Sequence, residues 1–423
     1  MKFISTRNST PSFSLDMALL AGLAPDGGLF VPETLPQINR ADFNPAMPFA
    51  AFASQLLHPF FASSQLENAL PAICERAFNF TIPLTQVDAS TWELELFHGP
   101  TLSFKDVGAR FLAECLSLLS NQKPITLLVA TSGDTGSAVA AAFYQKPGVT
   151  AVILYPEGQI SKRQAHQINC WGENILSLAV KGSFDDCQHL VKSAFADPNW
   201  KDMGLCTANS VNIGRLLPQM SYYAYTSLQF YLAHQQPAGF IIPTGNLGNA
   251  TAAYWAKAMG FPIREIVLAT NANQVISDYL VTGDFKPRAS INTLANAMDV
   301  GKPSNFERLQ YLFPSWPHFK QEANTFSVSD EAIKETIKEN YKIHQRFICP
   351  HTATAYNTRK QLSSEPWINV ATAHPCKFDD IIKPLLNQVP PIPLAMEKLL
   401  ARPCHERVVE NDLNAIKRMK MMH

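Results

Sequence analysis

Short apolar runs alternate with helix-patterned segments along most of the chain from about residue 89 onward. In these segments, such as SAVAAAFYQ and ATAAYWAKAMG, the apolar residues recur at helical spacing. Strands that are apolar throughout and alternate with helices are typical of parallel sheets covered on both faces. The pattern therefore predicts an α/β protein with two lobes. The apolar runs cover residues 125–130, 151–156, 175–180, 239–244 and 264–270.

The first part of the chain has a different pattern. Helical spacing dominates from residue 16 to about residue 79, where Pro59 and Pro71 are expected to interrupt the helices. We therefore expect an α-rich N-terminal unit over residues 1–85 and a two-lobed region over residues 86–423.

Composition narrows the class of protein. The chain has 423 residues, of which 46% are hydrophobic, and this is enough apolar material for two or three packed units. The 35 basic and 35 acidic residues balance to a formal net charge of zero. Such a balance gives no electrostatic footprint for nucleic acid or for anionic lipid. The expected partners are therefore small molecules, and we expect a monomer or a homodimer.

The cysteines and the apolar segments indicate the compartment. Eight cysteines are scattered along the chain without a Cys-x-x-Cys pair, which favours a reducing environment. The apolar patch at residues 17–24 follows an acidic residue, unlike a secretory signal. No apolar run approaches the roughly 20 residues that a membrane span needs. These features predict a cytoplasmic protein.

Two glycine loops have the same construction. TSGDTG (131–136) and TGNLGN (244–249) each follow an apolar run and precede an alanine-rich helix. A strand, a glycine turn and a helix start together present free backbone N–H groups and the positive end of a helix dipole, which favour an anion. We expect positive φ angles and close backbone approach at the glycines of both loops. A single loop could be an ordinary turn, but two matching loops favour anion sites, and neither spells a P-loop or G-x-G-x-x-G.

Lys105 lies at the expected first turn of a helix in HGPTLSFKDVGAR. The positive end of the helix dipole and the apolar Phe104 should lower the pKa of its amine, which makes the amine a usable nucleophile and base. Alternatively, Lys105 could pair with Asp106 or extend to water. An activated amine and a phosphate-binding loop in one chain are what a pyridoxal phosphate enzyme needs.

Seven segments, in this order along the chain, resemble the threonine synthase family. This family lies within the tryptophan-synthase-β-like, fold type II group of pyridoxal phosphate enzymes. The resemblance covers most of the chain, so it implies that fold and that cofactor. The segments are GLAPDGGLFVPETLP (22–36), FHGPTLSFKDVGARF (97–111), ATSGDTGSA (130–138), NSVNIGRLLPQ (209–219), PTGNLGN (243–249), KPSNFERL (302–309) and TAHPCKF (372–378).

The resemblance also implies roles for individual residues. Lys105 corresponds to the catalytic lysine, which forms the Schiff base with the cofactor and later moves protons. Thr372 corresponds to the partner of the pyridine nitrogen, where a hydroxyl instead of a carboxylate leaves the ring neutral. The residues that correspond to the cofactor-phosphate loop are Gly245, Asn246, Leu247, Gly248 and Asn249. The residues that correspond to the substrate site are Ser132, Asp134 and Thr135 for the carboxylate and Asn209 and Arg215 for the phosphate.

Two of these positions depart from the pattern of the resemblance. Leu247 stands where phenylalanine is frequent, which should alter packing more than chemistry. Many members of the wider group have asparagine where this chain has Asp134. The way in which this side chain meets the cofactor is therefore open.

The implied activity is the conversion of O-phospho-L-homoserine and water to L-threonine and phosphate, the last step of threonine biosynthesis. Two alternatives remain open from the sequence: a related phospho-lyase that yields a 2-oxo acid and phosphate, and a non-catalytic protein that binds a metal or a metabolite. Cys349 with His351 and His374 with Cys376 have suitable zinc ligands. One-residue spacing is not the usual zinc pattern, so the sequence predicts no metal site.

Overall fold

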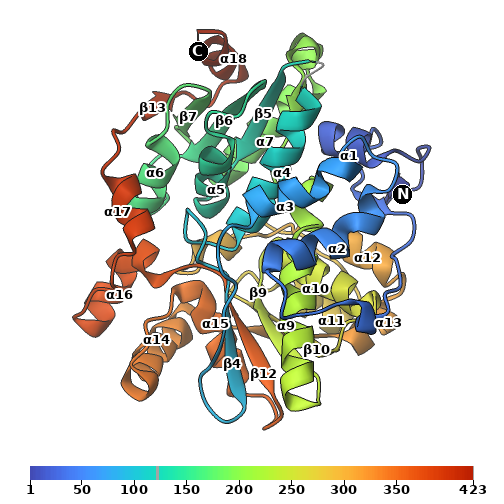
Figure 1. Ribbon diagram of the computed structural model, residues 1–423. Helices are drawn as coiled ribbons and strands as arrows, with labels where there is room; N and C mark the ends of the chain where they lie inside the picture. The colour runs from blue at the N-terminus through green and yellow to red at the C-terminus, as the bar shows by residue number, and fades with distance from the viewer. Residues whose placement is uncertain (121–122, 423) are drawn as a thin grey trace.

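A five-stranded sheet and a six-stranded sheet form the centres of two lobes (Figure 1). The computed structural model describes residues 1–120 and 123–422. The expected α/β architecture, with parallel sheets flanked by helices in two lobes, is confirmed.

The five-stranded sheet is parallel throughout and has the order β13-β7-β6-β5-β8. Its strands are β5 (Ile125–Ala130), β6 (Val149–Pro156), β7 (Ile175–Val180), β8 (Leu205–Cys206) and β13 (Arg407–Val409). Helices cover both faces because alternate residues of each strand point to opposite sides. Leu127 and Val129 belong to the main core with α5, whereas Leu128 packs with Leu190 of α7 in a separate cluster.

The six-stranded sheet has the order β11-β10-β9-β12-β4-β3, and β3 is its one antiparallel strand. Its strands are β3 (Leu84–Gln86), β4 (Thr91–Glu95), β9 (Ala238–Pro243), β10 (Ile263–Thr270), β11 (Ala323–Ser327) and β12 (Trp367–Ala371). Phe240 and Ile242 pack into the main core, whereas Ile241 between them packs with Ala355 of α15 on the other face.

Helices surround both sheets. The helices up to α9 are α1 (Leu15–Ala21), α2 (Phe49–Phe61), α3 (Leu70–Ala77), α4 (Lys105–Leu119), α5 (Asp134–Phe143), α6 (Lys162–Asn169), α7 (Phe184–Ala196), α8 (Ile213–Leu216) and α9 (Gln219–His234). Those that follow are α10 (Gly248–Ala258), α11 (Val275–Thr282), α12 (Phe306–Leu312), α13 (Trp316–Glu322), α14 (Asp330–His344), α15 (Pro350–Arg359), α16 (Asp379–Leu386), α17 (Leu394–Leu400) and α18 (Leu413–Met422). Within the described residues, no helix has the length and hydrophobicity that a membrane span requires.

The N-terminal region contains three helices and a small antiparallel pair, β1 (Phe3–Ser5) with β2 (Phe30–Pro32). The expectation that Pro59 interrupts a helix is wrong, because α2 continues through it to Phe61. Pro59 lies in the last turn, where only the carbonyl of the exposed Gln55 loses its helical partner. The expected boundary at residue 85 falls within β3, and the division into two domains stays a prediction.

Three neighbouring strands place the site. β9, β12 and β4 are adjacent and parallel, so their carboxyl ends lie at the same edge of the six-stranded sheet. The glycine loop 244–249 follows β9, Thr372 follows β12, and the segment before Lys105 follows β4. The second glycine loop follows β5 of the other sheet. Open parallel sheets bind ligands at such carboxyl ends.

Candidate active site

Lys105 begins α4, and the segment before it is tied to the end of β12. The Phe104 N–H donates to the Thr372 carbonyl at 2.9 Å, and Ser103 forms an isolated bridge with Ala373. These main-chain contacts hold Lys105 beside the predicted partner of the pyridine nitrogen. They also explain why a lysine can stand in this position without an ion pair to its sequence neighbours.

The amine of Lys105 lies in an environment that disfavours its charged form. Burial lowers the pKa of Lys105 from its ordinary 10.5 to about 8, opposed by Asp134 and reinforced by Lys377 and Arg215. The part of its surface that remains open lines a cavity. Its Nζ lies 5.2 Å from the centre of the Phe104 ring. The expected lowering of this pKa is therefore supported, and burial is its main cause.

The glycine loop after β9 differs in detail from the expectation. The positive φ angle is at Leu247, at +62°, and neither Gly245 nor Gly248 has one. Close approach does hold at Gly245, because a Cβ there would lie 2.6 Å from the Met298 Cα. The expected positive φ at Gly245 and Gly248 is thus wrong, since Leu247 makes the turn into α10.

The side chains of this loop are held from outside it. Asn249 Oδ1 accepts hydrogen bonds from the hydroxyls of Tyr222 and of Tyr223, the latter at 2.8 Å. Asn246 Nδ2 donates to Ser210 Oγ at 2.7 Å. In contrast, Asn249 Nδ2 is buried and has no partner within the described chain. A buried donor without a partner is unfavourable, so this amide is suited to an anion or another acceptor in the cavity.

The second glycine loop makes the expected helix start, but the positive φ expected at Gly136 is wrong, because Gly136 lies inside α5. Gly133 has a φ of +130°, which favours glycine, and α5 begins at the next residue. Thr131 Oγ1 accepts from the N–H groups of Gly133 at 3.0 Å and Gly136 at 2.8 Å. Ser132 and Thr135 remain partly exposed and line the cavity.

Asp134 is engaged by residues from two other segments. Its Oδ1 lies 2.6 Å from Lys377 Nζ and accepts from Gln164 Nε2 at 3.0 Å. Burial raises the pKa of the Asp134 carboxyl, but the charges of Lys377 and Lys105 outweigh burial and hold that pKa well below its usual range. Asp134 is therefore ionised.

Of the predicted substrate-phosphate residues, Asn209 lies between β8 and α8, and Arg215 lies in α8. Arg215 is buried, its Nη1 donates to the Ala208 carbonyl, and its Nε has no partner in the described ranges. Burial lowers the pKa of Arg215 to about 10, so the guanidinium is still cationic at neutral pH. Asn209 Nδ2 donates to the Ala130 carbonyl at 2.8 Å.

One cavity of about 670 Å³ brings every predicted site residue together. Its lining includes an amine, two glycine loops, two helix starts and a buried guanidinium. Pyridoxal phosphate fits the loop 244–249 because Asn249 Nδ2 is a buried donor that still lacks an acceptor, and Arg215 Nε is a second such donor that suits a further anion. The predicted residues in the lining are Lys105, Ser132, Asp134, Thr135, Asn209, Arg215, Gly245, Asn246, Leu247, Gly248, Asn249 and Thr372.

Sequence analysis missed His351 as a residue of this cavity. His351 is in the first turn of α15 and its Nε2 accepts from the Ala297 N–H at 3.1 Å. Burial lowers the pKa of His351 to about 4, so its imidazole is neutral. The Cys-Pro-His sequence at a helix start was the available signal, but it was considered only for zinc.

The two Cys and His pairs serve local structure. Cys349 Sγ accepts from the Thr352 N–H as the N-cap of α15, and His374 Nδ1 accepts from the Cys376 N–H. Over residues 1–120 and 123–422, no group of three or more His, Cys, Asp or Glu side chains could hold a metal ion.

The KPSNFERL segment braces the glycine loop. The Asn305 N–H and Nδ2 both donate to the Asn246 carbonyl, at 3.3 and 3.0 Å. Arg308 is fully buried and donates to the carbonyls of Phe30, Ser210 and Val211. This guanidinium therefore joins the N-terminal region to the loops of the site.

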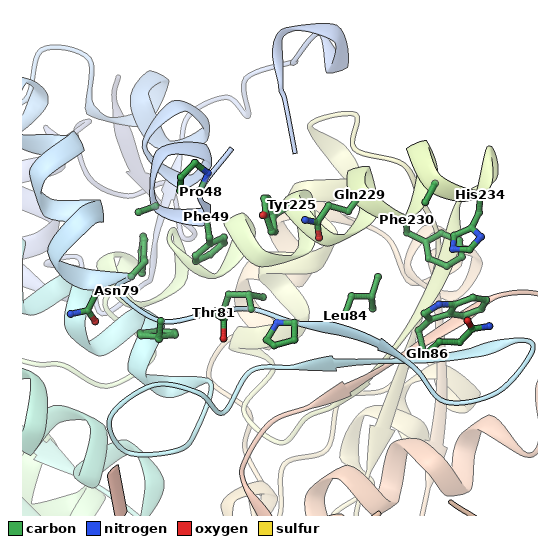
Figure 2. A pocket seen from close by; sticks show the side chains of 17 residues that line it. Pro48, Phe49, Asn79, Thr81, Leu84, Gln86, Tyr225, Gln229, Phe230 and His234 are labelled. Atoms are coloured by element: carbon green, nitrogen blue, oxygen red, sulfur yellow. The ribbon is translucent and has the colours of Figure 1, made fainter. Parts of the chain in front are cut away.

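A second hollow, of about 930 Å³, lies between the N-terminus of α2, α9 and the segment before β4. Figure 2 shows Phe49, Tyr225, Phe230 and Leu84 around it. No Asp, Glu, Lys or Arg lines it, and none of the predicted site residues does. It therefore lacks the groups that this chemistry needs.

Comparisons with known proteins agree with the geometry. A family described as pyridoxal-phosphate dependent enzyme matches residues 85–369. The threonine synthase N terminus matches residues 2–78, and the threonine synthase C-terminal family matches residues 350–419.

Full-length relatives are similar in sequence and in structure. The threonine synthase of Serratia marcescens is 39% identical over 94% of this chain and 93% of its own length. The crystal structure of threonine synthase from Escherichia coli superposes with a TM-score of 0.93 at 36% identity, over 100% of both chains. The structure of pyridoxal phosphate-bound threonine synthase from Brucella melitensis also gives 0.93, at 32% identity over 100% of this chain and 99% of that one. An amine and an anion-binding loop in one cavity, together with matches along the whole chain, make this chain a member of the threonine synthase family of pyridoxal phosphate-dependent lyases.

Proposed function

We propose that this enzyme converts O-phospho-L-homoserine and water to L-threonine and phosphate, as the last step of threonine biosynthesis. One observation carries the proposal: a single cavity is lined by the Lys105 amine, by the loop 244–249 and by the buried Arg215 guanidinium. This arrangement offers one group for proton transfer and separate places for two phosphates, which suits a phosphorylated amino acid beside a phosphorylated cofactor.

In this proposal the loop 244–249 and Thr372 hold the cofactor. The N–H groups at the start of α10 and the free Nδ2 of Asn249 bind its phosphate. The Thr372 hydroxyl, which lines the cavity, would be the partner of the ring nitrogen, and a hydroxyl there would leave the ring neutral. When bound, pyridoxal phosphate supplies an electron sink for the substrate carbons next to the amino group.

Lys105 moves the protons. Because its pKa is about 8, about a tenth of the amine is neutral at pH 7, and this fraction can accept a proton from the substrate. Each proton taken can be returned at another carbon by the same Nζ. The neutral His351 lines the same cavity but has its Nε2 occupied by the Ala297 N–H.

Other residues of the cavity lining orient the substrate. The hydroxyls of Ser132 and Thr135 and the first N–H groups of α5 bind the α-carboxylate. Arg215, with Asn209, binds the substrate phosphate until it leaves, because a guanidinium can donate two parallel hydrogen bonds to phosphate oxygens. Water then adds to the carbon next to the amino-bearing one.

Product analysis tests the proposal. Purified enzyme loaded with pyridoxal phosphate is incubated with O-phospho-L-homoserine, and proton and phosphorus NMR follow the products. The expected result is one threonine for each phosphate released. A 2-oxo acid in place of threonine would instead identify the phospho-lyase, and no turnover would leave only a binding protein.

The compartment and the assembly belong to the same proposal. All eight cysteines are free thiols, which supports a reducing compartment such as the cytoplasm. The N-terminal unit over residues 1–85 and the catalytic region over 86–423 are proposed as the two domains of a monomer or homodimer.

A further inference from the structure

A buried lysine behind the cavity lining is bound to Asp134 and has no part in the proposed chemistry. Lys377, in the short helix Pro375–Phe378 after β12, is fully buried. Its Nζ lies 2.6 Å from Asp134 Oδ1 and donates to the Thr101 carbonyl at 2.9 Å. Because Asp134 begins α5, this ion pair joins the two lobes at the cavity.

Lys377 also touches the segment that carries Lys105. Thr101, whose carbonyl accepts from Lys377, binds the Asp106 carboxylate through its N–H and its hydroxyl. Lys377 is thus in contact with the carboxylate loop on one side and with the first turn before α4 on the other.

Stability alone does not account for this pair. A buried ion pair is often replaced by apolar residues at no loss of stability, because the desolvation of two charges offsets their attraction. The position of the pair is more informative than its burial. Asp134 and Lys377 both act on the Lys105 amine, and they act in opposite directions.

The titratable groups around Lys105 come from five helices. Asp134 of α5 favours its ammonium form, whereas Lys377 and Arg215 of α8 disfavour it. His351 of α15 is neutral, and Asp106 of α4 is bound to Thr101. Without Lys377, the Asp134 carboxylate would be left as a counter-ion for Lys105, and the amine would retain its proton.

We propose that Lys377 is a positioning residue that binds the Asp134 carboxylate and prevents it from acting as the counter-ion of Lys105, so that the Lys105 amine can lose its proton. The inference rests on the proposed role of Lys105.

The test measures the titration of Lys105 in the cofactor-free protein. Trace acetylation with acetic anhydride over a pH series, read by mass spectrometry at Lys105, reports the neutral fraction of the amine. Lys377→Gln should raise the pH at which Lys105 titrates. For each pH unit of this increase, acetylation of Lys105 at neutral pH should fall about tenfold. Lys377→Arg, which keeps the charge, should restore wild-type behaviour.

A double variant separates charge from structure. Asp134→Asn alone should move the Lys105 titration to lower pH, because the Lys377 charge is then unopposed. Asp134→Asn with Lys377→Gln removes both charges and should return the titration close to that of wild type. If the single substitutions acted only by disturbing the packing, their effects on the Lys105 titration would add up in the double variant and would not cancel.

Arg163 provides a matched control at the same contact between segments. Its Nη2 lies 2.9 Å from Asp379 Oδ2 and its Nη1 donates to the Cys376 carbonyl, yet it is not among the charges that act on Lys105. Arg163→Gln should leave the Lys105 titration unchanged. Arg163 therefore bridges α6 and the segment after β12.

Two outcomes overturn the proposal. One is a Lys105 titration that is the same in wild type and in Lys377→Gln. The second outcome is used if Lys377→Gln does not fold. In that case, the proposal is overturned if Lys105 titrates at the same pH in Asp134→Asn and in the double variant. Because no substrate or cofactor is present, a failure of the proposed function would appear in product analysis and not in this titration.

Discussion

Asp106 binds Thr101 and not its neighbour Lys105. The Thr101 N–H donates to Asp106 Oδ2 at 2.9 Å and the Thr101 hydroxyl donates to Asp106 Oδ1 at 2.7 Å, with both residues buried. The carboxylate thus closes the turn in front of α4. Because Asp106 is bound to Thr101, it does not form an ion pair with Lys105. An amine that binds a cofactor must be free of such a pair.

The Asp106 contact can be tested by Asp106→Asn. The amide keeps the shape of the side chain but turns one acceptor into a donor, so the Thr101 hydroxyl must become an acceptor and its own proton loses its partner. We expect a loss of about 1–3 kcal/mol in the free energy of unfolding and slower uptake of pyridoxal phosphate. Thermal denaturation and visible absorbance measure the two effects. An unchanged variant would contradict the assignment.

Removal of the Lys105 amine should abolish the reaction. Lys105→Ala should reduce threonine formation by at least about 10²–10⁴-fold, the range that one general acid–base group contributes. The measurement is NMR of the products at saturating pyridoxal phosphate. Lys257→Ala is the control, because Lys257 pairs with Glu322 at 2.9 Å and does not line the cavity. Near-normal activity of Lys105→Ala would sink the proposed mechanism.

The pKa of Lys105 predicts how cofactor uptake depends on pH. Only the neutral amine attacks an aldehyde, so the rate at which the cofactor-free protein takes up pyridoxal phosphate should rise with pH. The rise should be half complete near pH 8, because burial lowers the pKa of Lys105 to about 8 from its ordinary 10.5. Stopped-flow absorbance gives the profile. A midpoint close to 10.5 would mean that the amine is solvated like a free lysine.

The strands and the main site residues could be predicted because their signals are local. An apolar run fixes a buried strand, and the runs at 125–130 and 175–180 coincide with β5 and β7. The glycine loops and the Lys105 segment are recognisable because each needs a particular backbone and a particular side chain within a few residues. Their convergence in one cavity then follows from the order of the parallel strands.

The remaining features depend on contacts between distant segments. Lys377 donates to a carbonyl 276 residues earlier in the chain, and no local pattern marks a lysine for such a contact. The positive φ of Leu247 also depends on the surrounding structure. Gly245 and Gly248 would tolerate a positive φ better, but the surrounding structure places it on the leucine. Pro59 was expected to end a helix on local grounds, and its position in the last turn removes the conflict.

Arg215 should contribute to substrate binding and not to cofactor binding. Arg215→Gln removes a cation whose Nε has no partner among the described residues. A hydrogen bond to a charged group contributes about 1.5–3 kcal/mol, so kcat/KM for O-phospho-L-homoserine should fall by about tenfold to 150-fold. Inhibition by inorganic phosphate should weaken in parallel. Visible absorbance of the bound cofactor should be unchanged, and a variant that loses the cofactor instead would place Arg215 at the other phosphate.

Gly245 tests whether the backbone of the glycine loop must stay where it is. An alanine Cβ at this position would lie 2.6 Å from the Met298 Cα and 2.8 Å from the Met298 carbonyl oxygen. Both are main-chain atoms, which cannot rotate away as a side chain can, so either the loop or the segment at Met298 must shift. Overpacking of this kind costs about 1–3 kcal/mol, and we expect Gly245→Ala to lower the melting temperature and to weaken pyridoxal phosphate binding.

Gly172→Ala is the matched control for this substitution. The atom nearest to a Cβ at Gly172 is His405 Nε2 at 3.6 Å, an ordinary contact, and φ at Gly172 is not positive. This variant should therefore keep both the melting temperature and the cofactor affinity of wild type. Backbone N–H groups point correctly at a phosphate only in one conformation of the loop, so a shift of the loop should weaken cofactor binding. Equal cofactor affinity in Gly245→Ala and Gly172→Ala would therefore contradict the assignment of the cofactor phosphate to this loop.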